Sequence, residues 1–408
     1  MNLSRFIRLA PGGSPIPGRV LAAIAFERDP ERALTEALGA RFPDHVPTYH
    51  ASGREAMRDA FARLAARSGR GEIALPAYCC YSLPASAVAA GLAVRLVDVD
   101  ERGRLSLESL DAVDLSRVAA IVVANLFGVP ESIAPIQERA RAAGVAVIDD
   151  AAQTIGGTTS EGAVGSRGDL GVLSFGRGKP VSAMGGGALL WRKDIVESPS
   201  ARCPRPGGSQ RVQALLRAIA YDAARHPVAL RLLAAIPALE IGTTVYDPGF
   251  ARGAMPAFVP CLAAPLLREL DRMTTAHRER AESLALRIRS ISAFEPSLAA
   301  EGDRGTYPRL AVIAPDPDLR DRALARLVPL GASGMYPESL GAIGALEPHL
   351  VGNRSCPGAR RFARRVLTLP THAGLDAGAV AVILETLHSP PAAAPSGRTA
   401  LRSSGPTA

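Results

Sequence analysis

The sequences VAVIDDAAQ at residues 145–153 and LGVLSFGRGKPVSAMGGGALLW at residues 170–191 decide the fold. In the first, a short apolar run ends in two adjacent carboxylates. In the second, two apolar runs flank a turn that is rich in glycine and carries Lys179. Because each run is apolar throughout rather than alternating, we expect strands of a sheet that is covered on both faces.

Similar short runs continue from about residue 50 to residue 192, and helical patterns separate them. In the segment EAMRDAFARLAAR, for example, Met57, Phe61 and Leu64 fall on one helical stripe. Strands that alternate with helices are typical of an α/β domain with a mostly parallel sheet. The apolar runs are EIALP (72–76), AVRLVDVD (93–100), AAIVVANLFG (119–128), VAVIDD (145–150), LGVLSF (170–175) and GALLWR (187–192).

Changes of composition predict how the chain is divided. Residues 1–195 are expected to form the large α/β domain, and residues 196–256 a helical insertion that begins with the linker SPSARCPRPGGS. Residues 257–388 contain a long helix candidate and the strand candidate YPRLAVIA, so we expect a smaller α+β domain there. The tail at 389–408 is of low complexity and is predicted to be disordered.

Residues 210–239 of the insertion contain two apolar helical patterns with interspersed arginines. This composition would allow a helix that lies on a membrane surface. Packing against the rest of the protein, or against a partner subunit, is the favoured interpretation.

The composition is that of a globular protein, with 47% hydrophobic and 21% charged residues among 408. The net charge is +8, but like charges do not form long runs and aromatic residues make up only 4%, so nucleic acid is not an expected partner. Five cysteines without a CxxC pattern predict neither a disulfide framework nor a metal site. We expect a cytoplasmic protein, since no signal sequence or long apolar span is recognisable.

Lysine is rare in this chain: Lys179 and Lys193 are the only lysines among 47 basic residues. A guanidinium group stays protonated and does not serve as a nucleophilic amine, so chemistry that requires a primary amine has two candidates. Lys179 lies between Gly178 and Pro180, in a turn whose glycines allow positive φ and a close approach to a ligand. A solvated loop lysine is the alternative.

Asp149 and Asp150 end a predicted strand, at the edge where ligands bind in open α/β sheets. Because side chains alternate across a strand, only one of the two should face a site. Either acid could instead cap a helix that starts at DAAQ. Ser52 and Gly53 open another predicted helix, whose first amide groups favour a phosphate unless Ser52 is simply an N-cap.

Four segments in order resemble the DegT/DnrJ/StrS family of sugar aminotransferases, which depend on pyridoxal phosphate and have the fold type I aminotransferase fold. The resemblance extends over roughly residues 45–388 and includes the closing segment RRVLTLPTHAGL. It implies a mostly parallel, seven-stranded sheet in the large domain and a smaller α+β C-terminal domain. The four segments are SGR (52–54), PAYCCYS (76–82), DDAAQ (149–153) and SFGRGK (174–179).

The resemblance also implies the roles of several residues around pyridoxal 5'-phosphate. Lys179 would hold the cofactor as an imine and later move a proton between substrate and cofactor. Asp150 would pair with the pyridine nitrogen, so that the ring acts as an electron sink, and Gln153 would lie on the hydroxyl side of the ring. The aromatic residue that stacks on the ring falls at Cys80, with the adjacent Tyr81 as the candidate substitute.

The phosphate of the cofactor is expected at the start of the helix that follows Ser52. The backbone of Gly53 and Arg54, together with the hydroxyl of Ser174, would hold it there. Lys179 and Asp150 are thus the expected catalytic residues, and no metal is implied.

Three positions depart from the family pattern. Arg54 replaces the usual threonine, and Asn125 stands where the family often has histidine. Ala251 occupies the place of an asparagine that reaches the partner subunit's cofactor phosphate, so Arg252 or the insertion would have to supply that contact.

Together these features predict an aminotransferase that moves an amino group from glutamate or glutamine to a keto sugar, expected to be nucleotide-linked. The product would serve the synthesis of polysaccharide, lipopolysaccharide or a natural product. We expect a homodimer, because active sites of this fold are built at a dimer interface. Two alternatives remain open: another pyridoxal-phosphate enzyme on the same scaffold, and a regulatory member without turnover. The presence of Lys179 favours transamination over dehydration.

Overall fold

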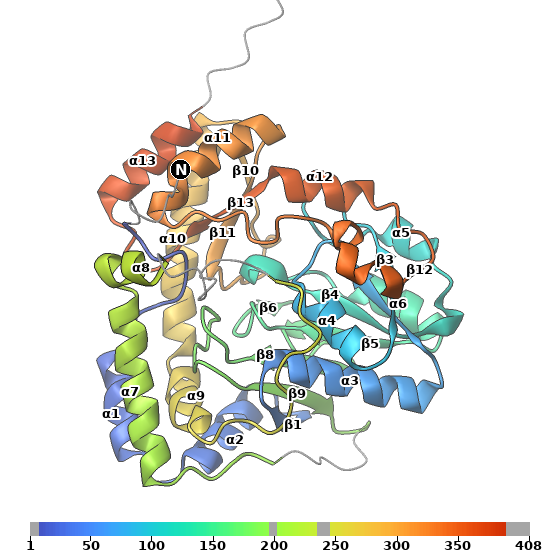
Figure 1. Cartoon of the computed structure of the whole chain (residues 1–408), viewed down its shortest axis with the longest axis horizontal. Coiled ribbons are helices and arrows are strands. Elements are labelled where there is room, and N and C mark those ends of the chain that lie inside the picture. The colour runs from blue at the N-terminus through green and yellow to red at the C-terminus, as the bar shows by residue number, and fades with distance from the viewer. Residues whose placement is uncertain (1–7, 196–201, 235–244, 389–408) are drawn as a thin grey trace, which may run out of the picture.

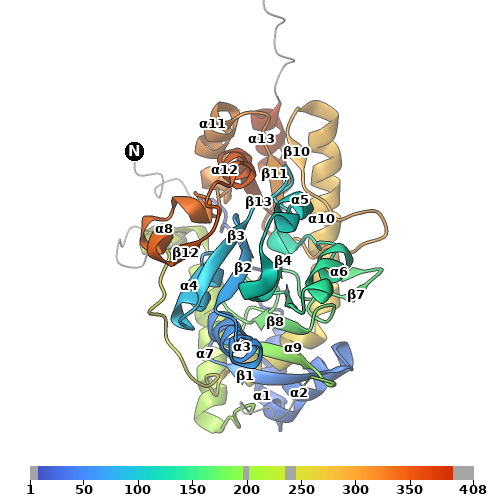
Figure 2. The same cartoon turned by 90° about the vertical axis from the view of Figure 1, so that its right-hand side faces the viewer.

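The computed structural model describes residues 8–195, 202–234 and 245–388, so the predicted tail at 389–408 lies outside the described residues. A large sheet with helices on both faces forms one part of the molecule, and a small sheet with its own helices forms the other (Figures 1 and 2). The long helix α10 (Leu270–Ile291) runs between the two parts (Figure 1). Within the described residues, no helix is long and apolar enough to cross a membrane.

The large sheet has strand order β1-β9-β8-β5-β4-β2-β3-β12. The pairs β1/β9 and β9/β8 are antiparallel, and the other neighbours are parallel. Residues 45–192 supply seven of these strands, which confirms the predicted mostly parallel sheet, and β12 adds a two-residue edge strand. The strands are β1 (His45–His50), β2 (Glu72–Pro76), β3 (Ala93–Val97), β4 (Val118–Ala124), β5 (Ala146–Asp150), β8 (Leu170–Ser174), β9 (Gly187–Arg192) and β12 (Leu350–Val351).

Among the seven strands that residues 45–192 supply to the large sheet, β1 is the one outside the predicted apolar runs, and all six runs form strands. Its sequence HVPTYH is largely polar and contains Pro47. Proline is tolerated because β1 is an edge strand, whose sheet neighbour is β9; its other side makes an isolated bridge at His50, away from Pro47. Tertiary pairing, rather than local hydrophobicity, therefore creates this strand.

Helices cover both faces of the large sheet and surround the small one (Figure 2). Short 3-10 helices lie at Leu115–Arg117, Leu126–Gly128, Val328–Leu330, Leu340–Ala342 and Gly344–His349. The α-helices besides α10 are α1 (Gly18–Phe26), α2 (Pro30–Arg41), α3 (Gly53–Ser68), α4 (Ser82–Ala89), α5 (Leu107–Asp111), α6 (Ala134–Ala142), α7 (Gly208–Ala224), α8 (Pro227–Ala234), α9 (Val259–Arg268), α11 (Pro317–Leu327), α12 (Pro357–Arg365) and α13 (Ala377–Leu387).

The helix α3 carries the predicted apolar stripe. Met57, Phe61 and Leu64 are buried, and the helix packs on β4, β8 and β9. Its start is capped by Ser52, whose hydroxyl accepts a hydrogen bond from the backbone N–H of Glu55 at 3.2 Å. Packing and capping together fix the position of the first turn of α3, which borders the site described below.

The helix α7, from the predicted insertion, packs against α1 and α9 through the buried Ala214 and Ala218. Its inner face therefore packs on the rest of the protein, which was the favoured interpretation of this segment. The helix α9 shares a buried core with α1, α2 and the large sheet. The small sheet, β10 (Glu295–Pro296), β11 (Arg309–Ile313) and β13 (Val366–Pro370), shares a different core with α10, α11 and α13. The domain boundaries at 195 and 256 stay predictions.

Gly171 in β8 offers a test of the packing between the sheet and the turn beside it. A Cβ atom at this position would lie 1.7 Å from the carbonyl oxygen of Gly165. We expect Gly171→Ala to lower the free energy of unfolding by about 3 kcal/mol, because backbone would have to move. Gly39→Ala in α2, with nothing within 4 Å of the added Cβ, should instead raise it by about 0.5–1 kcal/mol. Equal urea midpoints for the two variants would contradict this account.

Candidate active site

A cleft of about 1020 Å³ opens at the carboxyl ends of the parallel strands. Asn125, Asp150 and Ser174 line it where β4, β5 and β8 end, and the start of α3 lines it from one side. This is the edge at which open α/β sheets bind ligands. The predicted site residues that line the cleft are Ser52, Gly53, Arg54, Cys80, Asp150, Gln153, Ser174 and Lys179.

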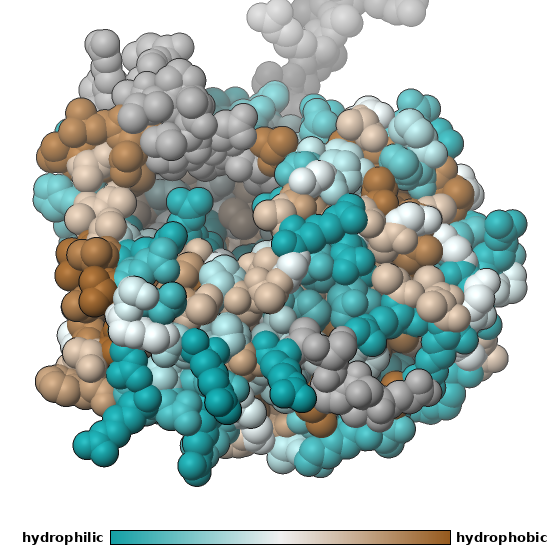
Figure 3. Space-filling model, turned by 60° about the horizontal axis from the view of Figure 1, so that its bottom comes forward, coloured by the Kyte–Doolittle hydropathy of each residue, from teal (hydrophilic) through white to brown (hydrophobic). Residues whose placement is uncertain are grey.

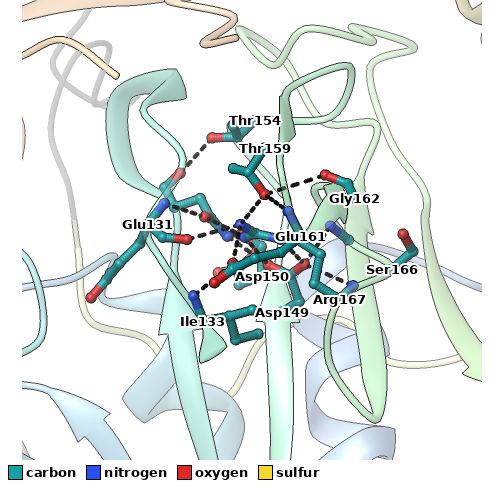
Figure 4. A network of polar contacts seen from close by, with 12 residues as sticks. Glu131, Ile133, Asp149, Asp150, Thr154, Thr159, Glu161, Gly162, Ser166 and Arg167 are labelled. Carbon is teal, nitrogen blue, oxygen red and sulfur yellow. Dashed lines mark hydrogen bonds and ion pairs between the residues drawn. The ribbon is translucent and has the colours of Figure 1, made fainter. Parts of the chain in front are cut away.

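The adjacent acids of β5 face opposite ways, as the alternation of a strand requires. Asp149 is fully buried within a polar network on the far side of the strand, whereas Asp150 lines the cleft (Figure 4). Neither acid caps a helix, because DAAQ forms turns. Instead, the carboxylate of Asp150 accepts a hydrogen bond from the backbone N–H of Ala152 at 2.9 Å. Asp150 is therefore the acid that faces the cleft.

The network around Asp149 fixes the ends of β4 and β5. The guanidinium of Arg167 donates to both carboxylate oxygens of Asp149, at 2.8 and 2.9 Å. Asn125 donates from its amide to Asp149 at 2.8 Å and to the backbone oxygen of Asp150 at 2.9 Å. The amide oxygen of Asn125 accepts from Arg167 at 2.9 Å and from the backbone N–H of Glu131 at 2.9 Å. Asn125, at the position where the family often has histidine, thus links the network to the cleft wall.

The electrostatics of this region follow from its burial. Burial acts to lower the pKa of Arg167, but the hydrogen bonds and charge of Asp149 outweigh it and raise the pKa of the guanidinium. Burial raises the pKa of Asp150 from its usual 3.8 to about 6, against the opposing effects of the Ala152 amide and the charge of Lys179. Burial likewise raises the pKa of Glu131 to about 7. A cationic group bound beside Asp150 would favour its charged form.

The first turn of α3 forms a narrow cradle with the end of β8. A Cβ atom on Gly53 would lie 2.8 Å from the Cβ of Ser174, so only glycine fits there without movement. Gly187 lies against the same turn, since its Cβ would be 2.5 Å from the backbone nitrogen of Gly53. Glycines here bring backbone against backbone, and they place the amide end of a helix beside the Ser174 hydroxyl. This is the kind of geometry that binds phosphate.

Only one of the two lysines reaches the cleft. Lys179 lines it from the turn after β8, where the preceding Gly178 has a φ of 74°. The positive charge of Lys179 acts on the carboxyl group of Asp150. Lys193 is exposed in the turn after β9 and does not line the cleft.

Cys80 and Tyr81, the two candidates for the position that stacks on a cofactor ring, are separated by the structure. Cys80 lines the cleft, and its thiol donates to the hydroxyl of Ser82. Tyr81 is buried with its ring 5.8 Å from that of Tyr336, and its hydroxyl bonds to the backbone of Glu338. Tyr81 immediately precedes α4, and its side chain lies in the core rather than on the cleft wall, so which residue stacks on a cofactor ring stays a prediction.

Gln153 lines the cleft with both ends of its amide engaged. Its oxygen accepts from the backbone N–H of Phe127 at 3.0 Å, and its nitrogen donates to the hydroxyl of Tyr336 at 2.8 Å. These bonds hold the side chain in one orientation against the cleft floor.

Arg54 and Ala251, two positions that differ from the family pattern, lie in different places: Arg54 lines the cleft, and Ala251 is on the outer surface. The guanidinium of Arg54 lines the cleft, 5.6 Å from the ring centre of Phe250 and 4.0 Å from a carboxylate oxygen of Asp247. Ala251 and Arg252 are exposed and do not line the cleft of their own chain.

Sequence reasoning missed two further walls of the cleft. Residues 10–12 line it from the N-terminal segment, and Tyr221 and Arg225 line it from α7. The hydroxyl of Tyr221 and the Nε of Arg225 are buried without a hydrogen-bond partner among the described residues. The spacing of Ala214, Ala218, Tyr221 and Arg225 along one helical face is the signal that could have found them. No group of three or more His, Cys, Asp or Glu side chains in the described ranges is arranged to hold a metal ion.

The buried ion pair between Asp149 and Arg167 makes a prediction about stability. Arg167→Ala should lower the free energy of unfolding by about 3–5 kcal/mol, because it leaves a buried carboxylate without its partner. Arg326→Ala is the matched control, since Arg326 pairs with Glu385 at 2.7 Å on the surface and should contribute about 1 kcal/mol or less. Urea denaturation of both variants measures the difference, and comparable losses would argue against a structural role for the pair.

The raised pKa of Asp150 makes a second prediction, for the protein without cofactor. The folded state holds the proton more tightly than the unfolded state, so ionisation of Asp150 costs stability as the pH rises from 3.8 to about 6. We expect Asp150→Asn to be more stable than the wild type by about 2–3 kcal/mol at neutral pH. The advantage should shrink as the pH falls towards 4, and a pH-independent difference in urea unfolding would refute the assignment.

Known proteins resemble this chain in sequence and in fold. UDP-N-acetyl-3-dehydro-alpha-D-glucosamine 3-aminotransferase of Acidithiobacillus ferrooxidans is 31% identical over 160 residues, which is 39% of this chain and 43% of that protein. The match therefore spans less than half of that relative.

Two solved structures share the fold over nearly the whole chain. Sugar aminotransferase CalS13 of Micromonospora echinospora superposes with a TM-score of 0.69 at 20% identity, covering 94% of this chain and 99% of its own. The PLP form of a Streptococcus pneumoniae protein superposes with a TM-score of 0.71 at 14% identity, covering 93% and 98%. A family model matches residues 28–388, and the chain therefore belongs to the DegT/DnrJ/EryC1/StrS aminotransferase family.

Proposed function

We propose that this protein is a pyridoxal-phosphate-dependent aminotransferase that moves an amino group from glutamate or glutamine to a keto sugar, with a nucleotide-linked sugar as the expected acceptor. The observation that carries the proposal is that Lys179, the buried acid Asp150 and the cradle at Gly53 and Ser174 line one cleft. The family of the chain and the activity named for its Acidithiobacillus relative support the same reaction.

The residues of the cleft fit the cofactor. The amides at the start of α3 and the Ser174 hydroxyl suit a phosphate, and the Gly53 position leaves no room for a side chain. Burial raises the pKa of Asp150 and so disfavours its ionised form. A protonated pyridine nitrogen beside it would stabilise the carboxylate as an anion. When bound, the cofactor supplies an aldehyde that takes up an amino group and a ring that withdraws electrons.

Lys179 has two roles in this proposal. As the one primary amine on the cleft wall, it would attach the cofactor, and after displacement by an amino donor it would move a proton at the substrate carbon. The nearby backbone of Gly178, with positive φ, lets the turn present this amine without steric conflict. Lys193 lies outside the cleft and would play no part.

The charge of the cleft supports an anionic acceptor. Among the described residues that line the cleft, Asp150 is the single acid, whereas the basic side chains are Arg54, Arg177, Lys179, Arg217 and Arg225. Arg177, Arg217 and Arg225 are not needed for the cofactor in this proposal. A diphosphate group on the acceptor would match that excess of positive charge. The proposal includes a homodimer in the cytoplasm.

The two lysines form a natural pair of variants. Purified wild-type protein mixed with pyridoxal 5'-phosphate should develop a visible absorption band, and borohydride reduction should fix the cofactor mass on the peptide that contains Lys179. Lys179→Ala should lose both signals and the activity. Lys193→Ala, in an exposed turn, should keep both. Labelling of Lys193, or none at all, would contradict the proposal.

A second measurement separates transamination from other chemistry on the same cofactor. Addition of glutamate or glutamine to the loaded wild-type protein should abolish the band and yield the amine form of the cofactor, which a nucleotide-linked keto sugar should convert back. A loaded protein that no amino donor converts would exclude the aminotransferase and favour one of the two alternatives, another cofactor-dependent enzyme or a regulatory protein.

A further inference from the structure

The outer face of α7 and α8 is apolar and exposed. On α7, Val212, Leu216 and Ile219 are each more than half exposed and follow the spacing of one helical stripe. On α8, Val228 and Leu232 are also more than half exposed and lie one turn apart. Figure 3 shows apolar residues gathered along the left side of the molecule, where Figure 1 places these helices.

This outer face is not needed to hold the helices in place. On the opposite side of α7, Ala214 and Ala218 are buried against the rest of the protein. Tyr221 and Arg225 turn towards the cleft and the N-terminal segment, where Arg225 donates to the backbone oxygen of Gly13 at 2.8 Å. Because the inner face already anchors α7, the outer stripe is a surplus of apolar surface, and such surfaces mark interaction sites.

The charge of the same segment is strongly positive. Residues 202–233 contain one acidic residue, Asp222, which turns inward and accepts from the backbone N–H of Ile16 at 3.1 Å. Arg211 precedes Val212, and Arg217 follows Leu216, so each is about 100° around the helix from an apolar residue of the stripe. The arginines of this segment are Arg202, Arg205, Arg211, Arg217, Arg225 and Arg231, of which Arg217 and Arg225 line the cleft and Arg205 pairs with Glu31 at 2.7 Å.

We propose that the outer face of α7 and α8 binds the surface of an anionic lipid bilayer. The helices would lie in the plane of the interface, with Leu216, Ile219 and Leu232 at the boundary between headgroups and acyl chains. Arg211 of α7 and Arg231 of α8, each adjacent in sequence to a residue of the apolar stripe, would contact anionic headgroups. An amphipathic helix with an apolar stripe and basic flanks is suited to this mode of binding.

Charge complementarity favours a lipid surface over a second copy of the chain. In a two-fold dimer the same patch meets itself, so Arg211 and Arg231 beside the stripe would face their counterparts in the second copy. Like charges at a contact oppose association, whereas an anionic bilayer neutralises them. Phe26, which is 81% exposed, would add to the membrane-facing surface, since Arg211 bonds to the backbone of the nearby Arg28.

Binding in this way would place the cleft close to the bilayer. Leu230 and Leu233 of α8 and Tyr221 of α7 line the cleft, while the outer residues of the same helices contact lipid. The two helices would therefore form the layer between cleft and membrane. This proposal does not depend on the reaction that the cleft catalyses.

Vesicle sedimentation with the full-length purified protein tests the proposal. The wild type should partition at least about tenfold more strongly into vesicles of phosphatidylglycerol and phosphatidylcholine than into pure phosphatidylcholine, and about 0.5 M salt should weaken the binding. The double variant Leu216→Glu, Leu232→Glu should lose about tenfold or more in partitioning, because it removes apolar contacts and adds negative charge.

A matched control comes from α10, which lies across the molecule from α8 (Figure 2) and whose Leu286 is 71% exposed. Leu286→Glu should bind vesicles as the wild type does, and circular dichroism should show all three proteins folded. Equal binding of wild type and double variant, or no preference for anionic vesicles, would overturn the proposal. The proposal would also fail if the wild type did not bind vesicles and the double variant had half the molar mass of the wild type in light scattering. The face would then be a protein interface.

Discussion

The ion pair between Asp149 and Arg167 is the interaction on which the cleft depends. Both side chains are almost completely withdrawn from solvent, and the guanidinium meets the carboxylate with two parallel hydrogen bonds. A charged group in such a place is tolerated only with a partner of this quality. The pair also ties in Asn125, so that the ends of β4 and β5 keep one relative position. Asp150 faces the cleft because its neighbour is held on the opposite side.

The cleft combines this rigid floor with walls from distant parts of the chain. The strand ends, the turn after β8 and the first turn of α3 contribute an acid, a primary amine and a narrow cradle of glycine backbone beside Ser174. The N-terminal segment and the helices α7 and α8 contribute apolar and basic side chains. A common fold can acquire its own binding surface through added walls such as these two helices, since function resides in sites rather than in the fold. The same pair leaves a basic, apolar surface on the outside.

Particular elements show what could be predicted. The six apolar runs became strands because a doubly covered sheet demands continuous hydrophobicity, and the Met57 stripe became the buried face of α3. The strand β1 escaped prediction because an edge strand needs only one partner and little apolar surface. Tyr81 was a reasonable candidate by its place next to Cys80, but neighbouring residues at a helix start point in different directions. The hydroxyl of Tyr81 forms hydrogen bonds with the backbone of Glu338, away from the cleft.

The sequence alone determined the alternation of strands and helices, the opposition of Asp149 and Asp150, and the restriction of lysine amines to two candidates, because each depends on local periodicity or on residue chemistry. Only the tertiary structure decided which acid faces the cleft, that Tyr221 and Arg225 line it, and that the stripe of α7 stays exposed. These features depend on contacts between residues far apart in the chain. A local stretch of sequence does not specify which distant surface will pack against a given side chain.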